Sequence, residues 1–241
     1  MTQISDGDTS VPRKVRIQSL DWTRGWMLVA SVTVNSWVFM PEWFQHAPWF
    51  GVHPVDVIFP IFVTLSGVGL AFANGRGPRF GPTLRRFVVL MLLGLAYNAI
   101  MRWGIDVSIW RVTGILQLYA VVTALISLMH LVTKTWRGWA VFTALLSFTQ
   151  TAILSIFATS CPAGVLTREC NPSGVVDAAF FGSSHIYHLG QAGHDPEGLI
   201  TILGAMISAS AGVTVGHILR SWVRRIPEDG MKPSKSIVPL V

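Results

Sequence analysis

Charged residues are scarce in this 241-residue chain, at 12% of the sequence, whereas an ordinary soluble domain carries about 25%. Hydrophobic residues make up 51%, and they fall into long blocks instead of alternating with polar residues. So few charges cannot coat a water-soluble globule. The composition therefore excludes an ordinary soluble domain and predicts an all-α, polytopic integral membrane bundle whose main partner is the lipid bilayer.

The sequence has little acidic charge, so its formal net charge is +6. A basic balance can indicate a nucleic acid partner. Here, however, the Lys and Arg residues cluster beside the apolar blocks, where membrane topology explains them better than nucleic acid does. We therefore expect no nucleic acid partner.

Six apolar blocks approach the ~20 residues that a helix needs to cross a hydrocarbon core about 30 Å thick. The block at 87–101 is short, so its ends are the hardest to place. The blocks predict transmembrane helices over 22–40, 55–73, 87–101, 112–132, 139–158 and 199–219. Residues 1–15 are polar and predict a flexible tail, and residues 221–241 form a second tail.

The basic residues are distributed unevenly about these six blocks. All but three of the 18 Lys and Arg residues precede or open the first block or follow the second, fourth or sixth; the exceptions are Arg102, Arg111 and Arg168. The positive-inside rule then places both termini in the cytoplasm of a cell membrane. The segments that precede the second and sixth blocks are predicted to face outward.

The first outward segment, 43–63, reads WFQHAPWFGVHPVDVIFPIFV. It places His46 and His53 among aromatic residues, and Asp56 at the mouth of the following apolar block. Aromatic rings with one polar edge favour a membrane–water boundary. An imidazole there can be reached by a polar substrate and can exchange a proton near neutral pH. The segment predicts a membrane-interface active site, although a single His residue is also consistent with an ordinary loop.

The sequence has only two cysteines, Cys161 and Cys170, both in the second outward segment. On an oxidising face, two thiols nine positions apart predict a small disulfide loop, and two free thiols are the alternative. A zinc site needs at least three protein ligands. Three histidines precede the last apolar block, but their spacing fits no strong metal pattern, so we expect no metal: His185, His188 and His194.

The last apolar block is preceded by the residues of a helix start. In DPEG, Asp195 suits an N-cap, Pro196 the first helical position, and Glu197 the positive end of the helix dipole. Within the block, small residues recur at every fourth position and permit close helix packing: Gly204, Ser208, Gly212 and Gly216.

Polar residues inside apolar blocks are costly in lipid and usually face protein or a cavity. Asn35, Asn98 and Gln117 are of this kind, and each can simply join helices through hydrogen bonds. Asn35 precedes His46 by eleven residues. An amide can stabilise an oxyanion and an imidazole can accept a proton. Acyl transfer from a thioester to an amine needs both of these roles.

The run 16–69, with SLDWTRGWMLVASVTVNSW, HAPWFG and VDVIFPIFVTLSG, resembles the opening of the heparan-α-glucosaminide N-acetyltransferase family. That family begins with an S-x-D-x-x-R-G element and an Asn in its first core helix. A His-Ala-x-Trp-x-Gly segment and an Asp-led, Phe-Pro-containing helix start follow. Later similarities are RVTGILQLYAV at 111–121, CPAG at 161–164, and FFGSSHIY followed by DPEG within 180–198. Order and approximate spacing agree over most of residues 16–220, which we interpret as one membrane acyltransferase-like domain.

The resemblance implies transfer of an acetyl group from cytosolic acetyl-CoA to an amino sugar or glycan on the outer side. It implies that His46 is catalytic and that Asn35 is its membrane-embedded partner. His46 either deprotonates the acceptor amine or carries the acetyl group itself. Five residues are the expected substrate-binding set: Asp56, His185, Tyr187, Asp195 and Glu197. Four arginines are candidates for CoA phosphates at the cytoplasmic mouth, although topology also explains them: Arg76, Arg79, Arg85 and Arg86.

Members of this family usually continue through several more membrane helices, whereas this sequence has none after residue 219. A shortened enzyme, one part of a homo-oligomeric assembly and an inactive homologue therefore stay open. An O-acyltransferase of envelope polysaccharide keeps the chemistry and changes the acceptor. A small transporter or scaffold also fits six spans, but transporters often contain internal repeats, and no persuasive repeat relates 20–130 to 131–220.

Overall fold

The computed structural model describes residues 18–223, with the side chains of Asn35 and Val223 left out. The predicted tail at 1–15 and nearly all of the tail at 221–241 therefore lie outside the described residues. Within 18–223 all regular elements are helical, as the sequence predicts. The α-helices are α1 (Gln18–Ser36), α2 (Ile58–Ala73), α3 (Phe80–Met101), α4 (Ile115–Met129), α5 (Trp136–Ala158), α6 (Pro172–Phe181) and α7 (Leu199–Val223).

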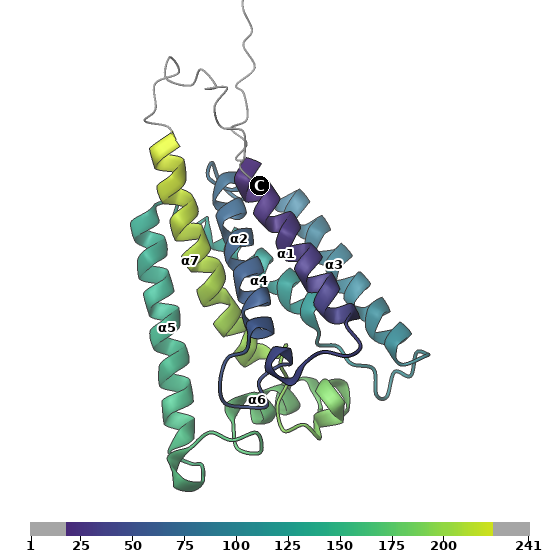
Figure 1. The fold of residues 1–241 in the computed structure, drawn as a ribbon. Helices are drawn as coiled ribbons and strands as arrows, with labels where there is room; N and C mark the ends of the chain where they lie inside the picture. Colours follow the sequence, from purple (N-terminus) through teal and green to yellow (C-terminus); the bar gives the residue numbers. More distant parts are fainter. Residues whose placement is uncertain (1–17, 224–241) are drawn as a thin grey trace, which may run out of the picture.

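Five short 3₁₀ helices lie in the connections between these helices. They are η1 (Glu42–Phe44), η2 (Pro54–Val57), η3 (Pro162–Gly164), η4 (Ser183–His185) and η5 (Tyr187–Gly190). The long helices run side by side, whereas α6 and the connections on either side of it gather at one end (Figure 1). We call this assembly the cap; the N-terminus of α1 and the C-terminus of α7 lie at the opposite end of the bundle.

Within residues 18–223, four helical segments are long and apolar enough to cross a membrane: Pro54–Ala73, Phe80–Met101, Trp136–Ala158 and Leu199–Trp222. The fourth predicted span corresponds to a shorter apolar helix, Ile115–Met129. The first corresponds to α1, which is helical but carries Asp21 and Arg24 and is not among the four. The number of six spans and the cytoplasmic position of the termini thus stay predictions.

Several predicted helix boundaries need correction, and the first helix, for example, ends at Ser36 and not at residue 40. The third helix begins at Phe80 and has 22 residues, because Arg85 and Arg86 lower the hydropathy of its first turns without interrupting the backbone hydrogen bonds of the helix. The fourth begins at Ile115, and not at residue 112. The residues before it are held by contacts to the cap that keep them out of the helix.

The core forms where α2, α4, α5 and α7 meet. Its most buried large side chains are contributed by these four helices: Val63, Leu118, Ile126, Trp139 and Val213. Large apolar side chains also cover the outer faces, for example Leu92 at 61% and Phe148 at 74% exposure. An apolar core beneath an apolar exterior is the arrangement expected of helices in lipid.

Small residues allow the backbones of α2 and α7 to approach closely. A Cβ atom added to Gly67 of α2 would lie 2.1 Å from the carbonyl oxygen of Ala209, and one added to Gly212 of α7 would lie 2.0 Å from that of Thr64. Gly216 is similarly tight against α2. The predicted role of the small-residue stripe in helix packing is confirmed for Gly212 and Gly216.

Candidate active site

His46 and Asp56 are brought together in the connection between α1 and α2. The Nδ1 atom of His46 lies 2.6 Å from Oδ1 of Asp56. The other carboxylate oxygen accepts the backbone N–H groups of His53, at 2.8 Å, and Ala47, at 3.3 Å. The His46 side chain is 76% exposed and that of Asp56 only 25%. The Asp56 carboxylate is therefore fixed by backbone hydrogen bonds, and it orients a solvent-accessible His46 imidazole.

This geometry selects one form of the imidazole ring. Because a carboxylate is an acceptor only, Nδ1 of His46 has to donate, and in the neutral ring Nε2 is then the basic nitrogen. The same relationship orients the histidine of serine hydrolases. The sequence predicts a substrate-binding role for Asp56, whereas the structure places its carboxylate on His46.

The other predicted members of this segment are placed differently. His53 has its Nδ1 atom 2.6 Å from the carbonyl oxygen of Gln45, so its ring fastens the loop and does not join the His46–Asp56 pair. Asn35 lies in the last turn of α1, but its side chain is outside the described part of the chain. Its proposed contact with an oxyanion therefore stays a prediction.

Cys161 and Cys170, predicted to pair, are bonded in the structure. The loop that they close, residues 161–170, contacts the residues immediately after His46. The indole N–H of Trp49 donates to the carbonyl oxygen of Leu166 at 3.0 Å, and the Arg168 guanidinium donates to the carbonyl oxygen of Pro48. The cap and the His46 segment are thus one connected structure.

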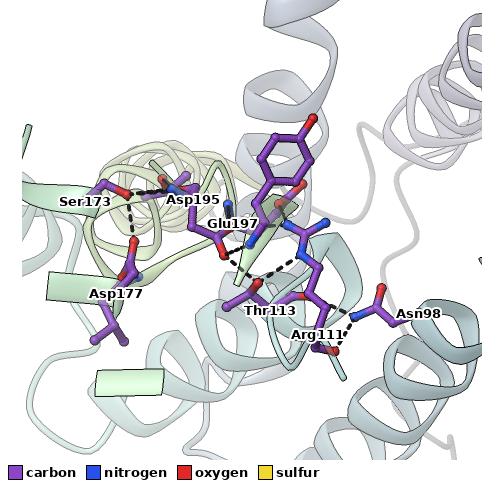
Figure 2. A network of polar contacts seen from close by, with 10 residues as sticks. Asn98, Arg111, Thr113, Ser173, Asp177, Asp195 and Glu197 are labelled. Carbon is purple, nitrogen blue, oxygen red and sulfur yellow. Dashed lines mark hydrogen bonds and ion pairs between the residues drawn. The ribbon is translucent and has the colours of Figure 1, made fainter. Parts of the chain in front are cut away.

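Asp195 is the centre of a polar network in the cap (Figure 2). Its side chain is fully buried. One carboxylate oxygen accepts hydrogen bonds from the Thr113 hydroxyl, at 2.6 Å, and from the Tyr187 N–H, at 3.0 Å. The other accepts hydrogen bonds from the Arg111 guanidinium, at 3.2 Å, and from the Glu197 N–H, at 2.9 Å. Four donors fill the carboxylate, so Asp195 joins chain segments and is poorly placed to bind substrate.

Arg111 extends this network towards α3. Its guanidinium pairs with Glu197 and lies 4.8 Å from the ring centre of Tyr187. The Asn98 amide donates to the carbonyl oxygens of Arg111 and Thr113, at 2.9 and 2.8 Å. Asn98 therefore joins α3 to the segment before α4 through hydrogen bonds, a structural role of the kind that the sequence allows for it.

His185 belongs to the same part of the cap. Its Nδ1 atom lies 2.9 Å from the carbonyl oxygen of Trp110, and its own carbonyl oxygen accepts the N–H of Val112. These contacts hold the residues before α4 against the cap and outside the helix. His185 and Tyr187 are consequently parts of the cap framework.

Burial changes the acidity of two carboxyl groups in the cap. It raises the pKa of Glu197, and the nearby Asp195 carboxylate raises it further, while Arg111 opposes both effects. Burial also raises the pKa of Asp177, against hydrogen bonds from Ser173 and from the Leu199 N–H. Both groups hold a proton more readily than exposed carboxyl groups do.

The last helix begins at Leu199, as its predicted span 199–219 has it, but the predicted capping is wrong, because Pro196 is not its first residue and Asp195 is not its N-cap. The Asp195 carboxylate accepts hydrogen bonds from Arg111, Thr113 and the Tyr187 N–H, and the N–H of Glu197, which it also accepts, lies in the turn before the helix. The first N–H of α7 is instead accepted at 2.7 Å by Asp177, which comes from α6. The sequence reasoning missed Asp177, although an acidic residue within VVDAAFF was an available signal.

The four candidate phosphate-binding arginines lie at the other end of α2 and the start of α3, and the structure separates them into two kinds. Arg86 donates to the Tyr119 hydroxyl at 2.7 Å, and that hydroxyl donates to Ser66 at 2.9 Å. All four residues are exposed, so the contact to Tyr119 and not burial distinguishes Arg86 from the other three: Arg76, Arg79 and Arg85. The 16 residues of α2, at about 1.5 Å each, separate this end from the His46–Asp56 pair.

Metal ligands do not gather in the described part of the chain: residues 18–223 contain no cluster of three or more His, Cys, Asp or Glu side chains arranged to hold an ion. The absence of a metal stays an expectation from the sequence.

Comparison with known proteins identifies the relatives of this chain. The catalytic-domain model of heparan-α-glucosaminide N-acetyltransferase matches residues 16–176. The human protein of that name is 23% identical over 87% of this chain, and the mouse protein is 22% identical over 85%. In each case the match covers 39% of the relative, so the chain spans about two fifths of the length of these curated relatives. The family model includes His46, Asp56 and both cysteines, and it covers well over half of the sequence: the chain belongs to the heparan-α-glucosaminide N-acetyltransferase family, as its motifs predict.

Proposed function

We propose that this protein transfers an acetyl group from acetyl-CoA, supplied on the side of the termini, to the amine of an amino sugar or glycan on the side of the cap. The observation that carries the proposal is the His46–Asp56 pair, at 2.6 Å with the imidazole exposed. Membership of a membrane acetyltransferase family supports the reaction class. The acceptor and the direction of transfer are parts of the proposal.

The chemistry requires removal of one proton from the acceptor. The amine nitrogen attacks the thioester carbonyl carbon and forms the C–N bond, while Nε2 of His46 takes the amine proton. The C–S bond then breaks, and the leaving CoA thiolate takes that proton from the His46 imidazolium, which restores the neutral ring. Asp56 holds the Nδ1–H and stabilises the imidazolium that forms. Asn35 is the proposed oxyanion donor.

A carrier route uses the same pair in two steps. Nε2 of His46 first attacks the thioester and releases the CoA thiol, and the amine then takes the acetyl group from the imidazole. Asp56 supports this route by holding the proton of the neutral ring on Nδ1, so that Nε2 carries the lone pair that attacks. Trapping an acetyl group on His46 when no acceptor is present would distinguish the carrier route from direct transfer.

Transfer to a hydroxyl group is the second candidate. A hydroxyl is a weak nucleophile until its proton is removed, and a His–carboxylate pair is the usual means of removing it. The same observation therefore supports O-acylation of an envelope polysaccharide, with the cap residues and donor unchanged.

The donor also has to be held at the far end of the bundle. Arg76, Arg79 and Arg85 are exposed there, and guanidinium groups bind phosphate oxygens strongly. The thioester would then have to reach along α2 to His46.

The test is acetyl transfer in proteoliposomes, with labelled acetyl-CoA on the side of the termini and glucosamine or a neutral sugar on the other. The wild type is compared with His46→Ala. His188→Asn is the matched control, because His188 is an exposed cap imidazole in the left-handed region (φ 47°) that Asn tolerates. Transfer by the wild type and the control, but not by His46→Ala, supports the proposal. Equal transfer by all three proteins would contradict the proposal.

A further inference from the structure

The His46 segment, residues 46–49, is hydrogen-bonded to a loop more than 100 positions later in the sequence. Trp49 donates to Leu166 across 117 positions, and Arg168 donates to Pro48 across 120. Asp56 accepts the N–H of Ala47, which lies between His46 and Pro48. The position of His46 relative to its carboxylate therefore depends on where Pro48 and Trp49 are held.

The loop that provides these ties is fixed by its own covalent closure. The Cys161–Cys170 bond joins its ends. Inside it, the Thr167 N–H donates to the carbonyl oxygen of Cys170 at 3.0 Å, and the Cys170 N–H donates to Thr167 Oγ1 at 3.1 Å. These contacts determine the directions of the Leu166 carbonyl group and the Arg168 side chain.

Asn171, immediately after the loop, connects it to the rest of the cap. Its buried amide donates to the carbonyl oxygens of Arg168, at 2.7 Å, and Gly193, at 2.8 Å. The next residue, His194, packs edge-on against Trp49 with ring centres 5.3 Å apart. Trp49 is thus held between the disulfide loop and the segment around His194.

We propose that the Cys161–Cys170 bond is a redox-sensitive positioning element for His46, with Trp49 and Arg168 as the positioning residues that transmit its state. The inference rests on the proposed function. Opening the loop frees the residues between the two cysteines and weakens the hydrogen bonds of Trp49 to Leu166 and of Arg168 to Pro48. Turnover then falls, while the helical bundle stays folded.

The redox step has one target. The sequence has two cysteines, and both belong to this bond. A dithiol reductant gives up two electrons and two protons, the S–S bond becomes two thiols, and the reagent becomes a cyclic disulfide. An oxidant of the disulfide class reverses the step.

Hydrogen exchange measured by mass spectrometry tests the positioning without any use of activity. The full chain in lipid nanodiscs is compared before and after reduction with a dithiol, alongside a Cys161→Ser/Cys170→Ser variant. We expect faster exchange over residues 42–57, including the amides of Ala47 and His53 that Asp56 accepts, in the reduced wild type and in the variant. The variant should not respond to the dithiol. Unchanged exchange over 42–57 on reduction would overturn the inference.

Kinetics test the consequence for catalysis. Reduction should lower kcat by roughly ten- to a hundredfold, the scale of a misplaced catalytic group, with little change in the KM for acetyl-CoA. Arg168→Ala should lower kcat in the same sense, and Arg168→Lys should restore part of it. The matched control is Arg102→Ala, because Arg102 is an exposed arginine that contacts Ile109 outside the His46 segment.

The two proposals fail in different ways. If the oxidised wild type transfers no acetyl group but reduction still speeds exchange over 42–57, the proposed function fails and the structural role of the bond stands. If the wild type is active and reduction leaves kcat unchanged, the positioning role is overturned.

Discussion

Asp177 in α6 accepts the backbone N–H of Leu199, the first residue of α7, at 2.7 Å. A side chain from α6 thus accepts the first backbone N–H of α7. The same carboxylate accepts the Ser173 hydroxyl at 2.6 Å, and its side chain is fully buried. This contact joins the cap to the last helix of the bundle and leads to the first prediction.

Asp177→Asn should fold normally, since an amide oxygen can accept the Leu199 N–H and the amide NH₂ can donate to Ser173. Asp177→Ala leaves a buried N–H without its acceptor, which costs about 1–3 kcal/mol. Thermal unfolding in nanodiscs measures both variants. Equal unfolding temperatures for Asp177→Ala and the wild type would contradict this role.

The pH dependence of the same variant follows from the raised pKa of Asp177, caused chiefly by burial. A raised folded-state pKa adds stability that is fully present below the unfolded-state pKa and is lost as pH rises through the folded-state value. Asp177→Asn lacks this contribution. Its stability relative to the wild type should therefore increase as pH rises above about 4, the ordinary carboxyl pKa. Parallel stability curves for the two proteins would contradict the effect.

Asp56→Asn tests the control of the His46 ring. The amide would present its NH₂ group to Nδ1 and favour the ring form with the proton on Nε2, which cannot act as a base. We expect kcat to fall by about 10⁴-fold, the effect of the equivalent change in a serine protease triad. The KM for acetyl-CoA should change little. A variant with wild-type kcat would show that Asp56 does not set the ring form.

Gly67→Ala tests the α2–α7 contact. The added methyl group would lie 2.1 Å from a backbone oxygen of α7, so the helices have to separate, at a cost of about 1–3 kcal/mol. Gly81→Ala is the control, because a Cβ atom there meets nothing within 4 Å. Unfolding temperatures that fall for both variants, or for neither, would contradict the packing argument.

Arg85→Gln tests the phosphate role at the far end of α2. Loss of one charge-assisted hydrogen bond of about 1.5–3 kcal/mol should raise the KM for acetyl-CoA by roughly tenfold or more. Lys134→Gln removes a charge from the connection between α4 and α5 and serves as the control. If both variants raise KM equally, the arginine acts through general charge and not as a ligand.

The sequence predicts the helical class of the chain well, because lipid leaves few alternatives to helices for long apolar blocks. It also predicts which two cysteines lie close together and which segment contains His46. Helix ends were harder to place. The start of α3 is hidden by two arginines that lower hydropathy without ending a helix. Asp195 does not cap α7 because its carboxylate accepts hydrogen bonds from the segment before α4, which no local pattern reveals.

The site was predicted less completely than the fold. Asp56 is ten positions from His46 in an irregular connection, where sequence spacing does not determine which side chains meet. Asp177 acts on a helix that begins 22 positions later. Both relationships depend on the tertiary arrangement of loops.

The glycine-lined contact between α2 and α7 also limits the route of a donor through the protein. Over the stretch from Thr64 to Ala71, the two backbones lie too close for any chain to pass between them. A thioester bound by the arginines, as we propose, would therefore have to travel towards His46 along a different face of α2. The close packing that stabilises the bundle thus also excludes one path across it.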